Sequence, residues 1–226
     1  MEKMKNIQAV LLDLDGTLTD PRQGITRCIE YALQKMGVTH QQPSLDWCIG
    51  PPLIESFEIL LNTADKNMLE QALALYRERF ADVGLYENTL YPDVVVGLHR
   101  LLQKGFRLYL ATSKPQVYAE RILAHFDVAD YFSGVYGSEL SGERSHKTDL
   151  IAYLIQQEAI DPESAMMVGD RKHDIIGARN NGVQTIAVAY GYGTPEELIQ
   201  AQPAYLCNSF GTVVRLLLDQ RRSYMG

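Results

Sequence analysis

The stretch Ile7-Gln8-Ala9-Val10-Leu11-Leu12-Asp13-Leu14-Asp15-Gly16-Thr17 decides the fold of this chain. Its first half is short and almost continuously apolar, which is typical of a strand buried on both faces of a parallel sheet. The strand stops at two acids, Asp13 and Asp15, that are separated by one residue. Carboxylates this close repel one another unless a cation lies between them or one is protonated. We therefore expect a buried strand that ends in a charged site; an acidic turn without function is the alternative.

Further short apolar runs follow along the chain and alternate with helical patterns. Alternation of this kind predicts an α/β fold with a doubly wound, Rossmann-like parallel sheet. Ligands bind such sheets at the carboxyl ends of the strands. The expected strands after the first are 106–111, 135–136, 165–168, 185–189 and, as a sixth candidate, 205–207; the expected helices are 94–103, 116–126, 147–158 and 174–181.

Residues 25–86 break the alternation, because they contain helical patterns and no convincing strand. Turn signals such as Gly37, Pro43 and Gly50 separate these helices. We expect a small α-helical cap inserted after the first strand, close to its carboxylates. The predicted division is a core of residues 1–18 and 88–220, a cap of residues 19–87 and a frayed tail of residues 221–226. The expected cap helices are 25–36, 53–61 and 65–81.

The bulk composition narrows the class of protein. The chain has 226 residues, of which 46% are hydrophobic and 22% charged, with a net charge of −7. This acidity argues against a nucleic-acid polymer or a membrane as partner. The three cysteines are too few and too scattered for a disulfide framework or a zinc site. With no signal peptide or membrane span evident, we expect a cytoplasmic protein that is a monomer or a homodimer.

Polar residues also follow other expected strands. Asp170 and Asp174 come after the run 165–168, and carboxylates from two neighbouring strand ends suit Mg²⁺, which prefers hard oxygen ligands. Thr112 and Ser113 come after the run 106–111 and offer hydroxyl and amide donors to a phosphate. A Ser/Thr pair at a strand end is common, so this signal is weak by itself.

Lys147 lies at the start of an expected helix, where a cation is unfavourable unless it faces an anion. This placement suggests a binding role, although a solvated lysine is the alternative. Arg144 and His146 are nearby competitors for that role. In the cap, Arg22 and the turn at Gly50 are our candidates for contact with a substrate.

Taken in order, these elements resemble the haloacid dehalogenase-like hydrolase superfamily over nearly the whole chain. The resemblance implies a nucleophile at Asp13, a general acid and base at Asp15, a phosphate-binding hydroxyl at Thr112 and a stabilising lysine at Lys147. It also implies a magnesium site made by the Asp13 carboxylate, the Asp15 carbonyl, Asp170 and a second acid at the metal shell, Asp174. Such a protein hydrolyses phosphate esters through an aspartyl phosphate.

The helical insert and the segment Gly191-Tyr192-Gly193 resemble the phosphoglycolate phosphatase-like branch. Ser113 departs from that branch, which usually has asparagine there. The segment Ile49-Gly50-Pro51-Pro52-Leu53 looks closer to the 5'-nucleotidase-like members, which puts phosphoglycolate in doubt as the substrate. We therefore expect a Mg²⁺-dependent phosphatase acting on a small phosphorylated metabolite.

Other activities stay open on the same scaffold. They are a phosphomutase, a phosphonatase and, outside enzymes, a non-catalytic phospho-receiver or binding protein. A phosphonatase needs a lysine from the cap, and neither Lys35 nor Lys66 has spacing that indicates this role. A receiver needs neither a lid nor a general acid such as Asp15. A dehalogenase is disfavoured, because its metal-free site needs no second acid.

Overall fold

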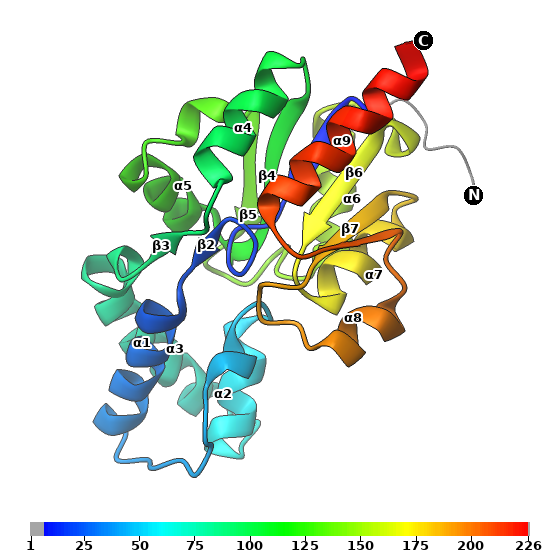
Figure 1. Cartoon of the computed structure of the whole chain (residues 1–226). Helices are drawn as coiled ribbons and strands as arrows, with labels where there is room; N and C mark the ends of the chain where they lie inside the picture. The colour runs from blue at the N-terminus through cyan, green and yellow to red at the C-terminus, as the bar shows by residue number, and fades with distance from the viewer. Residues whose placement is uncertain (1–6, 226) are drawn as a thin grey trace.

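The computed structural model of the protein describes residues 7–225 and has an α/β architecture (Figure 1). A six-stranded parallel sheet has the order β5-β4-β1-β6-β7-β8. Its strands are β1 (Ala9–Leu12), β4 (Arg107–Pro115), β5 (Gly134–Ser138), β6 (Ala165–Gly169), β7 (Gln184–Val188) and β8 (Tyr205–Cys207). The predicted fold class is confirmed, and β1 lies in the middle of the sheet because its side chains are apolar on both faces.

Helices cover both faces of the sheet. Val10 and Leu12 of β1 belong to the core shared with α4, α5 and α9, whereas Ala9 and Leu11 pack with α6 and α7. Successive strand residues point to opposite faces, so one short apolar run serves both layers. The bounds of these helices are α4 (Val94–Gln103), α5 (Gln116–His125), α6 (Lys147–Gln157), α7 (Lys172–Asn180) and α9 (Phe210–Met225), with the short α8 (Pro195–Ala201) beside α7.

Residues 21–88 form a separate helical layer beyond the strand ends (Figure 1). This layer contains α1 (Arg22–Lys35), α2 (Leu53–Leu61) and α3 (Lys66–Asp82). The chain enters it through β2 (Thr19–Asp20) and leaves it through β3 (Thr89–Leu90), and these two strands pair antiparallel as a narrow neck. This arrangement supports our proposed division into a core and a cap, with the crossing at residues 19–20 and 89–90.

The C-terminal segment differs from the expectation. We expected residues 221–226 to fray, but α9 continues to Met225, while Gly226 lies outside the described residues. Val213, Val214 and Leu217 recur on one side of α9 and are buried against the core, which anchors the helix. The short helix α8 was also not predicted.

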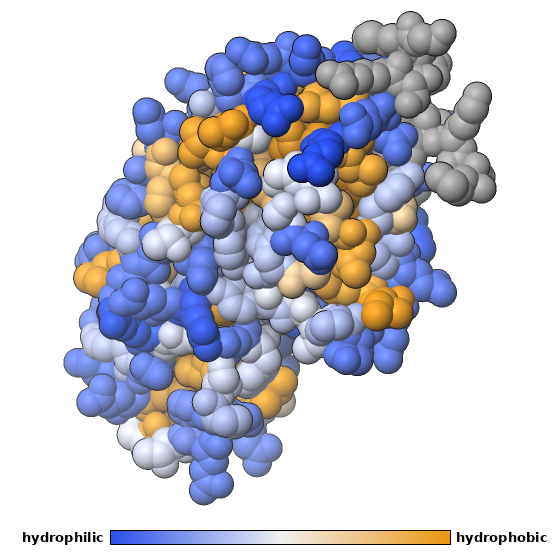
Figure 2. Space-filling model, viewed as in Figure 1, coloured by the Kyte–Doolittle hydropathy of each residue, from blue (hydrophilic) through white to orange (hydrophobic). Residues whose placement is uncertain are grey.

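The surface is mixed in character. On the face shown in Figure 2, apolar areas are separate patches among hydrophilic ones. Cys28, Cys48 and Cys207 are buried free thiols. Within residues 7–225 no helix has the length and apolar character needed to cross a bilayer.

Candidate active site

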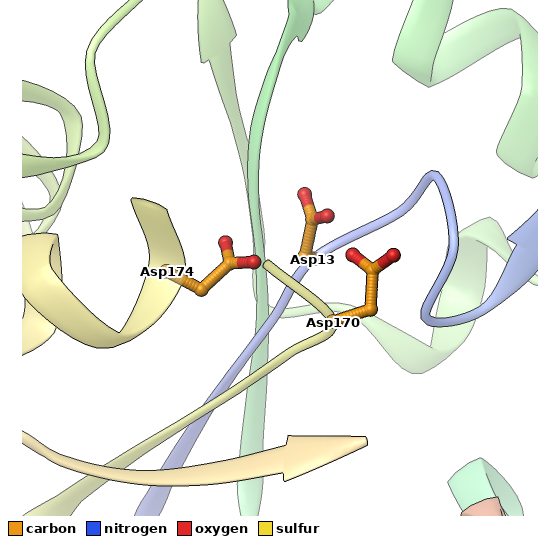
Figure 3. A group of neighbouring side chains, drawn as sticks. All are labelled: Asp13, Asp170 and Asp174. Carbon is orange, nitrogen blue, oxygen red and sulfur yellow. The ribbon is translucent and has the colours of Figure 1, made fainter. Parts of the chain in front are cut away.

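Three buried carboxylates meet at the carboxyl ends of the two central strands (Figure 3). Asp13 directly follows β1, Asp170 directly follows β6, and Asp174 lies in the first turn of α7. One oxygen from each lies within 4.8 Å of the others. The parallel pairing of Leu12 with Val168 fixes this proximity, because it brings both strand ends to the same edge.

The acids carry the electrostatic signature of a cation site. Burial raises the pKa of Asp13 to about 6, even though the charge of Lys147 lowers it. Burial and the charges of Asp13 and Asp174 raise the pKa of Asp170 well above its ordinary value. Among the described residues, Asp170 Oδ1 is buried and has no hydrogen-bond partner. Unsatisfied oxygens among like charges fit a hard divalent cation such as Mg²⁺, so these residues are suited to hold one.

Lys147 opens α6 and is the cation within this cluster. Its Nζ lies 2.7 Å from Asp13 Oδ1, 2.5 Å from Asp174 Oδ1 and 2.7 Å from the carbonyl oxygen of Ala111. Burial alone would lower the pKa of Lys147, but the two carboxylates outweigh it and raise that pKa. The lysine is therefore held charged beside Asp13, where it can neutralise a bound anion.

Asp15 points to a second buried lysine. Its Oδ2 lies 2.7 Å from Nζ of Lys114, and the two side chains are 10% and 6% exposed. Burial raises the pKa of Asp15, whereas the charge of Lys114 lowers it. Thr112 accepts a hydrogen bond from the Lys114 amide at 3.2 Å, which leaves the Thr112 hydroxyl proton for another acceptor.

A cavity of about 460 Å³ opens above Asp13 and Asp15, between the cap and the core. Its floor is polar and includes Thr112, Ser113 and Lys114, whereas its cap side is largely apolar. The cap-side residues include Leu53, Ile54, Leu73, Tyr76 and Phe80. A charged group therefore fits the floor, and a less polar group fits the space beneath the cap.

A model of the haloacid dehalogenase-like hydrolase family matches residues 10–188, which contain the three acids as well as Asp15, Thr112 and Lys147. The chain belongs to the haloacid dehalogenase-like hydrolase family. A 5'-nucleotidase of Pseudomonas aeruginosa is 43% identical over 92% of this chain and 94% of its own length. A phosphoglycolate phosphatase of Aliivibrio fischeri is 30% identical over 94% of this chain and 97% of its own.

Two further similarities extend this family assignment. The tyrosine-protein kinase PtkA of Mycobacterium tuberculosis is 36% identical over 82% of this chain, which spans 63% of that longer protein. The crystal structure of a predicted phosphatase from Clostridium acetobutylicum has a TM-score of 0.91 and 39% identity, covering 95% of this chain and 100% of its own. The predicted resemblance to the hydrolase family and its phosphoglycolate phosphatase and 5'-nucleotidase members is therefore confirmed.

The structure of this hydrolase brings together all but one of the site residues proposed from sequence. Gly50 lines the cavity, as do Thr112 and Ser113. Arg22 does not, because its guanidinium lies 2.7 Å from the Asp46 carboxylate and faces a separate hollow near the neck. The ion pair with Asp46 places Arg22 outside the lining of this cavity, so the structure gives no support for Arg22 as a substrate contact.

The structure also shows the positions of Arg144 and His146, the two residues that competed with Lys147 for the anion-binding role. Arg144 pairs with Glu139 and Glu143 and stacks on Tyr153, so it does not join the acids. His146 precedes α6 and is exposed. Lys147 is the buried cation among these three neighbours.

Sequence reasoning missed several residues of the site. Arg171 is buried, pairs with Glu197 at 2.9 Å and donates to the carbonyl oxygen of Ile49 in the cap. The Tyr192 amide donates to Asp170 Oδ2 at 2.7 Å. Lys114 was missed although it follows Thr112 and Ser113 directly. Adjacency to a candidate motif was the available signal for Lys114 and Arg171, whereas the Tyr192 contact depends on tertiary structure.

Gly16 allows Asp170 to reach the cluster. Its φ is +86°, and a Cβ at this position would lie 2.1 Å from Asp170 Oδ2. We expect Gly16→Ala to destabilise the protein by about 1–3 kcal/mol, because it combines backbone strain with displacement of Asp170. Urea unfolding and Mg²⁺-induced shifts in Tm measure the two effects.

Gly37→Ala is the matched control for that prediction. Gly37 has φ +68°, but a Cβ there meets nothing within 4 Å, so its substitution introduces backbone strain alone. Equal Tm shifts on Mg²⁺ addition in the two variants would contradict a role for Gly16 in placing Asp170.

Proposed function

We propose that this hydrolase is a Mg²⁺-dependent phosphatase that acts on a small phosphorylated metabolite through an aspartyl phosphate on Asp13. The observation that carries the proposal is the pairing of Asp13 with Lys147 Nζ at 2.7 Å, at the floor of a cavity that also contains Asp15 and Thr112. A buried carboxylate beside a charged lysine is a nucleophile next to a site for an anion. The relatives named 5'-nucleotidase and phosphoglycolate phosphatase support the same chemistry.

In the proposed reaction, an Asp13 oxygen attacks phosphorus and the bond from phosphorus to the leaving oxygen breaks. Asp15 gives its proton to that oxygen, and later takes a proton from the water that hydrolyses the aspartyl phosphate. Lys147 and the Thr112 hydroxyl bind the phosphoryl oxygens, where negative charge is concentrated. When bound by Asp13, Asp170 and Asp174, Mg²⁺ supplies further neutralisation of that charge. We also propose the Asp15 carbonyl as a metal ligand.

The leaving group is proposed to lie beneath the cap. Gly50 and the apolar side chains of Leu53 and Phe80 line this part of the cavity. A volume of about 460 Å³ suits a metabolite rather than a polymer. The candidates are nucleoside monophosphates, phosphoglycolate, sugar phosphates, pyrophosphate and phosphotyrosine. A phosphomutase or phosphonatase activity stays the alternative, followed by a phospho-receiver role.

The test is turnover of a chromogenic phosphate ester with Mg²⁺, and with EDTA in place of Mg²⁺, followed by a panel of the candidate metabolites. We expect release of phosphate that EDTA abolishes. Absence of turnover across the panel, together with no effect of Asp13→Asn on binding of the esters, would refute the enzyme proposal. A product that retains its phosphate at a new position would instead indicate a mutase.

The raised pKa of Asp13 predicts that Mg²⁺ binding depends on pH. Below a pKa of about 6, Asp13 becomes protonated, and a proton must leave before a cation can bind. We therefore expect Mg²⁺ affinity to fall by up to about tenfold per pH unit below pH 6. Calorimetric titration at pH 5 and pH 7.5 measures this, and equal affinities would contradict the prediction.

The stability of the metal-free protein should also change around the pKa of Asp13, but it should fall as the pH rises, whereas Mg²⁺ affinity should increase. A carboxyl whose pKa is raised by folding stabilises the protein at low pH, and this contribution is lost as the pH rises through about 6. The metal-free protein should therefore gain more in Tm from Mg²⁺ at pH 7.5 than at pH 5. At a Mg²⁺ concentration of 100 times Kd, binding adds about 2.7 kcal/mol to the free energy of unfolding.

The remaining expectations stay predictions. We propose a monomer or homodimer in the cytoplasm, with neither a nucleic-acid polymer nor a membrane as partner. The net charge of −7 supports the last two points, since both partners favour basic surfaces.

A further inference from the structure

Lys114 is a second buried lysine in the cavity, and the steps proposed above do not use it. Its side chain is 6% exposed, and its Nζ lies 2.7 Å from Asp15 Oδ2. Burial of a flexible, strongly hydrated ammonium is unfavourable unless its charge is compensated. The position therefore requires an explanation beyond chain packing.

The two oxygens of Asp15 have different surroundings. Oδ2 is paired with Lys114, whereas Oδ1 is buried and has no hydrogen-bond partner within the described part of the chain. Asp15 lines the cavity together with Asp13. The pairing therefore fixes the carboxyl through one oxygen and leaves the other for a group bound in the cavity.

The backbone of β4 directs Lys114 toward this position. The register of β4 with β5 shifts between Ala111 and Pro115, so a bulge contains Thr112, Ser113 and Lys114. Bulges beside active sites commonly re-aim side chains. The hydrogen bond from the Lys114 amide to Thr112 Oγ1 further fixes the turn, which joins the lysine to the proposed phosphate-binding hydroxyl.

The cap completes the surroundings of the lysine. Nζ of Lys114 lies 4.6 Å from the centre of the Phe80 ring on α3. Phe80 itself stacks on Tyr76 and packs edge to face on Tyr118. A cation over an aromatic face is attracted by it, so Phe80 of the cap restrains the ammonium in addition to Asp15.

We propose that Lys114 is a positioning residue for the acid–base step: it holds Asp15 through Oδ2 so that Oδ1 faces the leaving oxygen. The proposal rests on the phosphatase function proposed above. In the first displacement the Asp13–phosphorus bond forms, the bond to the leaving oxygen breaks, and the proton on Asp15 Oδ1 moves to that oxygen. In the second, water attacks phosphorus, the Asp13–phosphorus bond breaks, and Oδ1 receives a proton from the water. Lys114 keeps its own protons throughout.

The test compares two substrates that differ in their need for a proton. p-Nitrophenolate leaves without protonation, whereas the alkoxide of an alkyl phosphate requires it. We expect Lys114→Met to lower kcat/KM about a hundredfold for the alkyl phosphate and to leave it nearly unchanged for p-nitrophenyl phosphate. Lys114→Arg should recover part of the loss, because it retains the donor to Asp15.

A double-mutant comparison separates positioning from folding. In the Asp15→Asn background, Lys114→Met should cause little further loss for the alkyl phosphate, since both changes remove the same function. Lys104→Met, at an exposed lysine after α4, is the control, and Lys114→Gln replaces Lys114→Met if the latter does not fold. Equal losses for both substrates, no loss for either, or additive losses with Asp15→Asn would overturn the proposal. Wild-type protein that hydrolyses neither ester would refute the phosphatase function instead.

Discussion

Replacing Asp13 by asparagine is expected to abolish turnover of phosphate esters while the fold stays intact. The amide cannot form the covalent intermediate, so kcat should fall by about 10⁴-fold or more. The fold should survive, because the change removes one of three buried acids that repel one another, and Lys147 retains Asp174 at 2.5 Å. Steady-state kinetics and thermal unfolding measure the two effects on the same sample.

Asp130→Asn is the control for this prediction, since Asp130 is exposed and lies in the turn 129–131 after α5. It should leave both kcat and Tm near wild type. Mass spectrometry of wild-type protein quenched during turnover should show a phosphorylated chain, and Asp13→Asn should show none. A phosphorylated Asp13→Asn variant would place the nucleophile elsewhere.

Replacing Lys147 by methionine is expected to impair both stability and turnover. Three buried carboxylates would lose the lysine that contacts two of them at 2.7 and 2.5 Å. Removing one partner of a buried ion pair costs about 3–5 kcal/mol. Loss of a donor to the phosphoryl oxygens should lower kcat by about 10²–10³-fold. Urea unfolding without metal and kinetics at saturating Mg²⁺ measure these effects.

Mg²⁺ provides an internal check on the Lys147 prediction. A divalent cation among the same acids should restore much of the lost stability but little of the lost kcat, because it cannot replace the lysine contact on the phosphoryl group. Lys172→Met, an exposed lysine at the start of α7, is the control and should affect neither quantity. If Lys147→Met were as stable as Lys172→Met without metal, the buried ion pairs would not be an important source of stability.

The six sheet strands were all predictable, because each contains a short apolar run; β1 and β6 are buried along their whole length, whereas the edge strands β5 and β8 are partly exposed. The boundaries of the strands were harder to predict. For example, β4 continues to Pro115 through the polar bulge, where apolar patterning gives no signal. The short helix α8 has a Thr194 cap, Pro195 at its first position and acids in its first turn, which are local helix-start signals.

The proposed site was predictable where its chemistry lies at strand ends. Asp13 and Asp170 follow apolar strands, and Lys147 stands at a helix start that disfavours a cation, so all three had a local signal. Lys114 had only its adjacency to Thr112 and Ser113 as a signal, because its burial depends on the bulge in β4 and on Phe80 from the cap. The position of Arg22 outside the cavity was equally unpredictable, because it depends on an ion pair with Asp46, which is a tertiary contact.

The antiparallel neck of β2 and β3 also bears on how this protein could change in evolution. Thr19 pairs with Leu90 and Asp20 with Thr89, so the helical insert starts and ends at adjacent points. An insertion whose ends already touch places little demand on the chain that carries it, and such positions tolerate exchange of whole segments. The insert can therefore be lengthened, shortened or traded for another while the strand ends that hold Asp13 and Asp170 stay in place. New substrates could then arise by exchange of the gene segment between two breakpoints, near residues 19–20 and 89–90, with the two flanking segments that encode the core inherited unchanged.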